Sequence, residues 1–156
     1  MSETADESGA RSLDKSAARN VGLAIAGLIG LAIVAFLALV PKVGPPPAEI
    51  ASDPLLVKGR EVYLDRCVSC HGEKGKGDGP IAKGLKGSPV GDLTAPRWKH
   101  GDTPAQVREV IALGVPSTNM AAWGRTLGAE NLRAVTAYVY FLAGRPVPEE
   151  LRKPGP

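Results

Sequence analysis

Cys67-Val68-Ser69-Cys70-His71 is the stretch of this sequence that decides its fold. The two cysteines lie about one helical turn apart, and a histidine follows the second cysteine directly. Thiols at this spacing can form thioethers with vinyl groups on neighbouring pyrroles of a porphyrin, and the adjacent imidazole can then take one axial position on the iron. The stretch therefore predicts haem c attached through Cys67 and Cys70, with His71 as an iron ligand.

Other uses of two cysteines remain open: a structural disulfide, half of a zinc site, or a redox dithiol of the thioredoxin type. Zinc needs two further ligands, yet the chain has only 2 cysteines, and His100 is its one other histidine. Aromatic residues make up 4% of the chain, which is few for a self-sufficient core, and a haem would fill the missing volume. Haem is therefore the preferred prediction.

An uncharged apolar run at 21–40 precedes the motif. Its length matches a transmembrane helix of about 20 residues. It is longer than the apolar part of a removable signal peptide, and no clear cleavage site follows, so we expect an uncleaved signal anchor. Arg11, Lys15 and Arg19 precede the run, whereas only Lys42 follows it closely. By the positive-inside rule, the N-terminus is cytoplasmic and the rest lies on the periplasmic side of the inner membrane.

Four further segments complete the expected organisation. Residues 1–20 are polar and mixed in charge, so we expect them to be disordered, or loosely helical near the membrane. Residues 41–51 form a proline-rich linker, which is short and stiff. The folded domain covers 52–144, and the proline-rich tail at 145–156 is expected to be disordered or to lie on a partner. The formal net charge of +3 is too small and too dispersed to indicate nucleic-acid binding.

Three helices are predicted within the folded domain. The first begins at a cap formed by Ser52 or Asp53 and ends at the cysteine motif. The second opens with a capping box at 103–106, and the third covers 129–143 with one apolar stripe. Between the first two, the glycine and proline density of 72–101 allows no more than one short turn. Such a long loop needs a surface to pack on, which a haem supplies.

This order of features resembles the class I c-type cytochromes over residues 52–144. The resemblance rests on the motif after a first helix, Gly77-Asp78-Gly79-Pro80, Asp92-Leu93-Thr94, a methionine loop and an aromatic-bearing last helix. It implies an all-α class I cytochrome c fold, with three to four helices packed around one covalently bound haem c, long loops, and one preceding transmembrane helix. It also implies that Gly59 and Tyr63 on the first helix cross Tyr138 on the last.

The resemblance further implies a second axial ligand. In this family a methionine late in the domain supplies it, and Met120 is the one match because the other methionine is the initiator. A thioether opposite an imidazole favours the ferrous state and raises the reduction potential. The alternatives are that Met120 only fills a gap in the core, or that His100 is a rival ligand. A lone loop histidine beside Lys99 is more often a surface residue.

Three supporting residues also follow from the resemblance. The carbonyl of Pro80 is expected to accept the ring N–H of His71 and so to orient the imidazole. Arg97 and Trp98 are expected to reach the haem propionates through the guanidinium and the indole N–H. The alternative for this pair is a solvated arginine beside a tryptophan that packs the loop.

These features predict one-electron transfer between redox donor and acceptor proteins, without catalysis by the chain itself. The short linker favours a fixed subunit of a respiratory or photosynthetic complex, of the oxidase or alternative complex III type, over a free-standing anchored shuttle. A haem enzyme or sensor with an exchangeable sixth ligand is disfavoured, because the Met120 loop offers no acid–base groups. A basic rim is expected to steer docking onto an acidic partner: Lys74, Lys76, Lys83, Lys86, Arg97 and Lys99.

Overall fold

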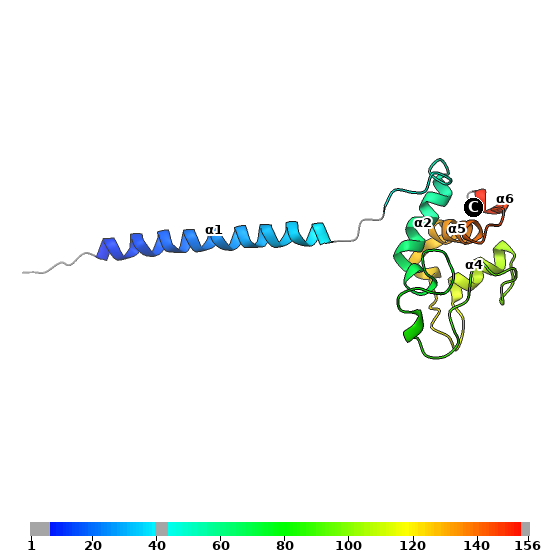
Figure 1. Cartoon of the computed structure of the whole chain (residues 1–156). Helices are drawn as coiled ribbons and strands as arrows, with labels where there is room; N and C mark the ends of the chain where they lie inside the picture. Colours follow the sequence, from blue (N-terminus) through cyan, green and yellow to red (C-terminus); the bar gives the residue numbers. More distant parts are fainter. Residues whose placement is uncertain (1–6, 40–43, 154–156) are drawn as a thin grey trace, which may run out of the picture. The chain divides into compact units, whose positions relative to one another are not determined.

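The computed structural model describes residues 7–39 and 44–153, and within these ranges the chain is helix and loop without strands (Figure 1). The chain divides into two compact units, Met1–Lys42 and Val43–Pro156. The all-helical architecture confirms the predicted fold class.

The first unit contains helix α1, Glu7–Leu39. Its segment Ala17–Leu39 is long and apolar enough to cross a membrane, judged by length and composition, and its side chains are exposed. Of the two alternatives expected for 1–20, residues 7–20 take the helical one and continue the helix toward the N-terminus. Once the apolar run is helical, each added residue gains a hydrogen bond without a new nucleation step, and the alanines, arginines and lysine of this segment favour helix. Residues 1–6 and Val40 lie outside the described residues.

In the second unit, helix α2, Pro54–Arg66, crosses helix α5, Gly124–Leu142, in the most extensive contact between its helices. Gly59 lies at the crossing, where a Cβ atom would collide with the carbonyl of Ala134 and with Cβ of Tyr138. The rings of Tyr63 and Tyr138 pack beside it, with centroids 5.4 Å apart and planes tilted by 58°. The expected crossing of the first and last helices is therefore confirmed.

Helix α4, Pro104–Leu113, packs against α5 and buries Val107 and Ile111. It opens with the predicted capping box between Thr103 and Gln106. In α5, Gly128 has φ 70° and ψ 171°, which interrupts the helix. The regular part of α5 thus begins at the predicted position, and a short turn precedes it within the expected loop.

Two short helices complete the region around the motif. Helix α3, Val68–His71, follows Cys67 directly, and the 3-10 helix η1, Ala82–Gly84, is the one short turn between α3 and α4 in this described stretch. The buried hydroxyl of Tyr63 donates to the carbonyl of Gly72 at 2.7 Å. This bond ties the start of the long loop to the last turn of α2.

The C-terminal tail packs onto its own domain. Its helix α6, Glu149–Arg152, buries Leu151, which is 3% exposed. Arg133 donates to the carbonyl of Leu151 at 2.6 Å, and Arg152 pairs with Asp53 at 2.8 Å. The expectation of a disordered or partner-bound tail is therefore wrong for 145–153, because one apolar side chain and two arginines fix the segment locally.

The expected linker is also partly folded. Ile50 is fully buried and belongs to the same hydrophobic cluster as Leu151, and its N–H donates to the carbonyl of Pro47 at 3.1 Å. Arg60 of α2 donates to the carbonyl of Gly44 at 2.9 Å. The packed unit therefore includes residues from Gly44 onward, and of the expected linker at 41–51 only 41–43 lie outside the described residues.

Candidate haem site

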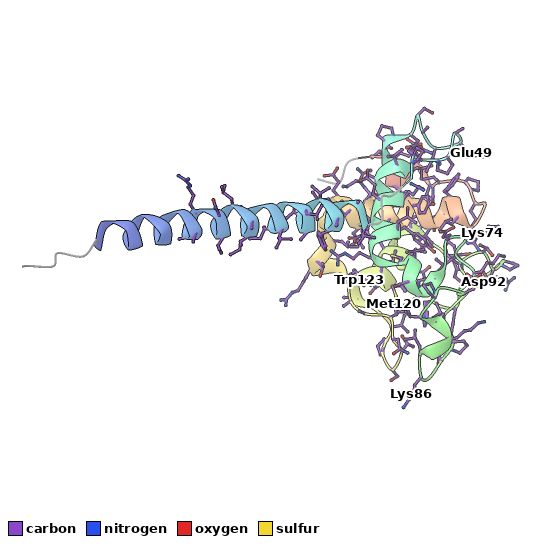
Figure 2. The ribbon with its side chains drawn as sticks, turned by 60° about the vertical axis from the view of Figure 1, so that its left-hand side comes forward. Glu49, Lys74, Lys86, Asp92, Met120 and Trp123 are labelled. Carbon is purple, nitrogen blue, oxygen red and sulfur yellow. The ribbon has the colours of Figure 1, made fainter. Side chains whose placement is uncertain are left out.

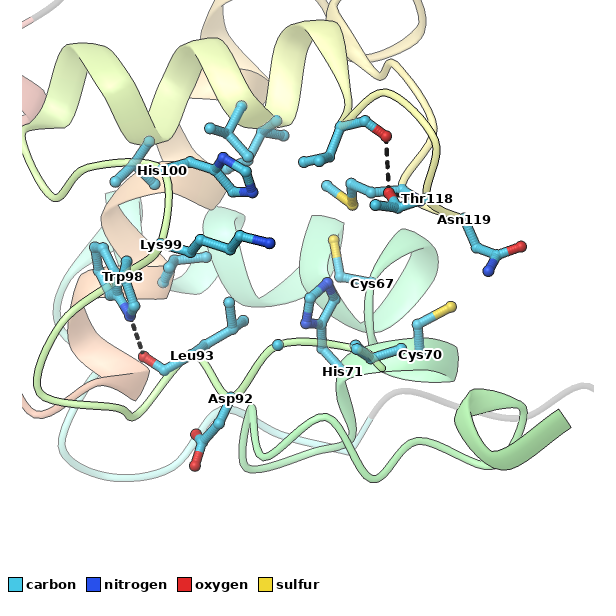
Figure 3. A pocket seen from close by; sticks show the side chains of 18 of the residues that line it. Cys67, Cys70, His71, Asp92, Leu93, Trp98, Lys99, His100, Thr118 and Asn119 are labelled. Atoms are coloured by element: carbon cyan, nitrogen blue, oxygen red, sulfur yellow. Dashed lines mark hydrogen bonds between the residues drawn. The ribbon is translucent and has the colours of Figure 1, made fainter. Parts of the chain in front are cut away.

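A cavity of about 430 Å³ lies between the helices of the second unit, and Cys67, Cys70, His71 and Met120 all line it (Figure 3). Its apolar wall comes from the loop before α4, from α4 itself and from α5. The wall includes Leu93, Val107, Val110, Ile111, Val135 and Val139. The cavity size falls in the range of cofactor sites, which are mostly apolar with a few converging polar groups.

Both cysteines stand at the junction of α2 and α3 and are free thiols, so the structure does not show the disulfide alternative. Burial raises the pKa of Cys67 to about 12, and the neighbouring Cys70 and Asp65 add to this shift. The N–H of Cys70 donates to the carbonyl of Cys67 at 3.2 Å. The short helix thus keeps the two thiols one turn apart, as attachment to a porphyrin requires.

His71 ends α3 and lines the cavity. Burial lowers the pKa of this imidazole, and the backbone of Gly91 opposes the shift. The neutral ring is therefore favoured at neutral pH, and a neutral imidazole is the form that binds a metal. Its Nδ1 is buried, and no acceptor among the described residues reaches full hydrogen-bond geometry. Gly91 is thus near the ring, although its contact falls short of a good hydrogen bond.

Pro80 does not take the role expected for it. It is exposed and does not line the cavity, and the backbone beside His71 is that of Gly91. The hydrogen bonds of the two residues that flank Pro80 explain its position. Gly79 donates to the carbonyl of Cys70 at 3.0 Å, and Ile81 donates to the carbonyl of Ser69 at 3.1 Å. These bonds hold Pro80 along the backbone of α3, away from the imidazole. Gly91 directly precedes the Asp-Leu-Thr stretch, which was the one signal for it in the sequence.

The loop between α4 and α5 brings Met120 to the cavity. Its N–H donates to the hydroxyl of Thr118 at 3.1 Å, and its carbonyl accepts from Val115 at 3.1 Å. Asn119 donates to the carbonyl of Lys86 at 2.8 Å, which ties this loop to the long loop after α3. Trp123, which Figure 2 labels together with Met120, also lines the cavity. The methionine is therefore held by its backbone, with its side chain half-buried.

Arg97 and Trp98 both line the cavity, but Trp98 has another hydrogen-bond partner than expected. Its indole N–H donates to the carbonyl of Leu93 at 2.7 Å, and an indole has only one such donor. In this structure the indole N–H is therefore engaged by the backbone of its own loop. The ring packs edge-on against Tyr140, with centroids 5.3 Å apart, and under the guanidinium of Arg145 at 4.1 Å.

Two more residues of this segment line the cavity, namely Lys99 and His100. Both are exposed. Lys99 was counted from the sequence only as part of the basic rim, because nothing in a loop pattern shows which way a lysine points. The apolar residues of α4 and α5 were likewise assigned to the core, and they form the cavity wall as well.

These residues fit a haem. Residues far apart in the sequence converge on one apolar cavity, with two thiols and a buried imidazole on one side and a thioether also in its lining. Among the described residues, no three His, Cys, Asp or Glu side chains lie together as a zinc site would need. Cys67 and Cys70 would hold the porphyrin, and His71 and Met120 would be available to the iron.

The family model for cytochrome C oxidase, cbb3-type, subunit III matches residues 54–139. The chain belongs to this family. It is therefore a c-type cytochrome, which confirms the predicted class I cytochrome c fold and implies haem c as the cofactor. The match covers α2 through most of α5 and thus every residue of the cavity discussed above.

Individual relatives agree with the family match. The chain is 35% identical to the cbb3-type cytochrome c oxidase subunit FixP of Azorhizobium caulinodans, over 58% of this chain and 28% of that protein. It is 36% identical to subunit CcoP of Rhodobacter capsulatus, over 55% of this chain and 29% of the relative. The chain thus matches less than a third of the length of these relatives. A solved chain of the reducing HAO-like protein complex of Kuenenia stuttgartiensis gives a TM-score of 0.54 at 28% identity, over 65% of this chain and 50% of that one.

Proposed function

We propose that this cytochrome carries one haem c with His71 and Met120 as axial ligands, and that it transfers single electrons as a membrane-anchored subunit of a cbb3-type or related oxidase. The observation that carries this proposal is the convergence of Cys67, Cys70, His71 and Met120 on a single cavity. The names of the relatives, which are oxidase subunits, support the host complex.

The bound haem supplies the one-electron couple of its iron, and the chain provides its surroundings. Cys67 and Cys70 fix the ring covalently, so that its orientation stays constant. Burial of His71 keeps its imidazole neutral and therefore ready to bind a metal. The valines of α4 and α5 exclude water from the cavity, and low polarity disfavours the more charged oxidised state. The thioether of Met120, which also lines the cavity, would favour the reduced state as well.

The proposed location is the inner membrane, with the N-terminus in the cytoplasm and the haem domain on the periplasmic side. The apolar segment Ala17–Leu39 supports the anchor, and the basic residues before it support the orientation. Haem attachment outside the cytoplasm requires the same orientation. Protease treatment of intact spheroplasts should remove the haem-stained domain, whereas protection of this domain would contradict the orientation.

The host complex distinguishes a fixed subunit from a free-standing shuttle. Mild detergent extraction, blue-native electrophoresis and haem staining should give a band far larger than the monomer, with oxidase subunits in the co-purified fraction. A haem band found only at monomer size would support the shuttle instead. The ratio of pyridine-haemochrome absorbance to protein should equal one haem per chain.

Replacing Met120 by alanine tests the axial assignment. The Met120→Ala protein should keep its covalent haem but show a lower midpoint potential and should bind carbon monoxide when reduced. Thr118→Ala is the matched control, because it removes the hydroxyl that accepts from the backbone of Met120 and leaves the thioether in place. An unchanged spectrum and potential in Met120→Ala would overturn the assignment. Rapid carbon monoxide binding by the unaltered protein would instead favour an exchangeable sixth ligand.

A further inference from the structure

Charge is distributed unevenly around the haem cavity. The two thiols, Tyr63 and His71 are set aside here. The other charged or titratable residues that line the cavity are Arg66, Asp92, Arg97, Lys99 and His100. Three of these come from one run, which we call the 97–100 wall. The carboxylate of Asp92 is already engaged, because it accepts from the N–H and hydroxyl of Thr94 at 2.7 Å each and lies 3.8 Å from the amine of Lys76. The wall therefore has excess positive charge.

All four residues of the 97–100 wall line the cavity, and Lys99 is the one whose side chain ends in a primary amine. Figure 3 shows its amine extending between Trp98 and the side of the cavity that holds Cys67 and His71. No ion pair of Lys99 occurs with any residue that the structure describes. Trp98 cannot offer a donor to a second acceptor, because its single N–H binds Leu93. Lys99 thus brings to the cavity lining a cationic donor that has no ion-pair partner among the described residues.

The 97–100 wall is fixed from outside the cavity. Arg145 donates to the carbonyl of Pro96 at 2.7 Å and to that of Ala95 at 3.3 Å, and its guanidinium covers the ring of Trp98. After the wall, the hydroxyl of Tyr140 donates to the carbonyl of Asp102. Both ends of the segment are therefore anchored on α5 and the tail, so the backbone of Lys99 is held in place at the cavity mouth.

We propose that Lys99 binds a carboxylate of the attached haem c and thereby orients the haem and raises its reduction potential. This inference rests on the proposed function, since it concerns the same cavity. Haem carries two propionates, and a carboxylate that leaves bulk water needs a charge-assisted hydrogen bond. The thiols fix one side of the ring, and the excess positive charge lies at the wall across the cavity from them. A cation at that position also disfavours the oxidised iron, which carries one more positive charge.

Replacing Lys99 by methionine in the full-length, haem-loaded protein tests this proposal. Lys99→Met should lower the midpoint potential, and the potential should fall more steeply over about pH 5 to 8, because a carboxyl without its cation has a higher pKa. Lys83→Met is the matched control, since Lys83 lies in η1, is exposed, does not line the cavity and carries the same charge. The midpoint potential of Lys83→Met and its pH dependence should match those of the unaltered protein. Lys99→Arg should have a midpoint potential close to that of the unaltered protein.

The proposal is overturned if Lys99→Met and Lys83→Met shift the potential and its pH dependence equally, or if Lys99→Arg behaves like Lys99→Met. Haem staining of the unaltered chain on a denaturing gel separates this failure from that of the proposed function. A chain without covalent haem contradicts the proposed function itself. A stained chain whose potential ignores Lys99 contradicts only the role of this lysine.

Discussion

Asp53 is a single carboxylate that joins two distant parts of the chain. One of its oxygens caps α2 by accepting from the N–H groups of Leu55 at 3.1 Å and Leu56 at 3.2 Å. The other accepts from Arg152 of the tail at 2.8 Å. Burial alone would raise the pKa of Asp53, but the Arg152 guanidinium and the two backbone donors outweigh it and lower the pKa. The ionised form is therefore favoured in the folded state.

This pKa shift predicts how stability depends on pH. Because the pKa of Asp53 is lower in the folded than in the unfolded state, its contribution is present above the unfolded pKa of about 4 and is lost as pH falls through the folded pKa. Asp53→Asn keeps the cap but loses the charge. It should reduce the free energy of unfolding at pH 7 and leave a smaller further loss on acidification to about pH 3 than the unaltered domain shows.

Chemical denaturation followed by circular dichroism at the two pH values measures this difference. Asp65→Asn is the control, because Asp65 is exposed and pairs only with its neighbour Arg66. Equal acid sensitivity in the Asp53 variant and the unaltered domain would contradict the role given to this carboxylate.

At the scale of elements, the α2–α5 crossing is the contact on which the cavity depends. A methyl group at Gly59 would meet the backbone carbonyl of Ala134, which cannot move without displacing α5. Gly59→Ala should therefore lower the free energy of unfolding by about 1–3 kcal/mol or more, as overpacking does. Gly84→Ala is the matched control because nothing lies within 4 Å of its Cβ position. Thermal unfolding of the haem-loaded domain measures the stability of both variants. Equal stability of the two variants would show that α2 and α5 can move apart at the crossing without loss of free energy of unfolding.

Helix starts could be predicted from the sequence because their causes are local. The Asp53 cap and the Thr103–Gln106 capping box each lie within four residues of the N–H groups that they satisfy. The folded tail and the folded part of the linker could not be predicted in this way. Ile50 and Leu151 are single apolar residues in proline-rich segments, and each is buried only because the tertiary fold brings it into one cluster.

The candidate haem site likewise has a part that could be predicted from local sequence and a part that depends on the tertiary structure. The thiols and His71 form one local motif, and Met120 was the one methionine available, so the sequence could place all of them at one site. The partners of His71 and Trp98 depend on the path of the long loop, which glycine and proline leave open. The loop places Gly91 beside the imidazole of His71. It also places the carbonyl of Leu93 where it accepts the indole N–H of Trp98.

For the whole molecule, the cavity sets how strongly folding depends on haem. The cavity is lined by apolar side chains of α4 and α5, and without haem these side chains would face water instead of packing against a partner. The free energy of unfolding of an ordinary domain is only about 5–15 kcal/mol, so the loss of this burial removes a large part of it. The Cys67→Ala/Cys70→Ala double variant should therefore lose covalent haem and with it the cooperative thermal transition in circular dichroism. A transition like that of the loaded protein would show that the helices pack stably by themselves.

The burial of Cys67 also bears on the order of events during maturation. A thiol adds to a carbon–carbon double bond most readily as thiolate, and a pKa of about 12 leaves almost none of it inside the closed domain at neutral pH. We therefore expect thioether formation at Cys67 to be faster in a chain whose α2 has not yet docked on α5. The covalent bonds would then form first and the tertiary structure would close over a cofactor already in place, so that a chain that folds too early would be a poor substrate for attachment.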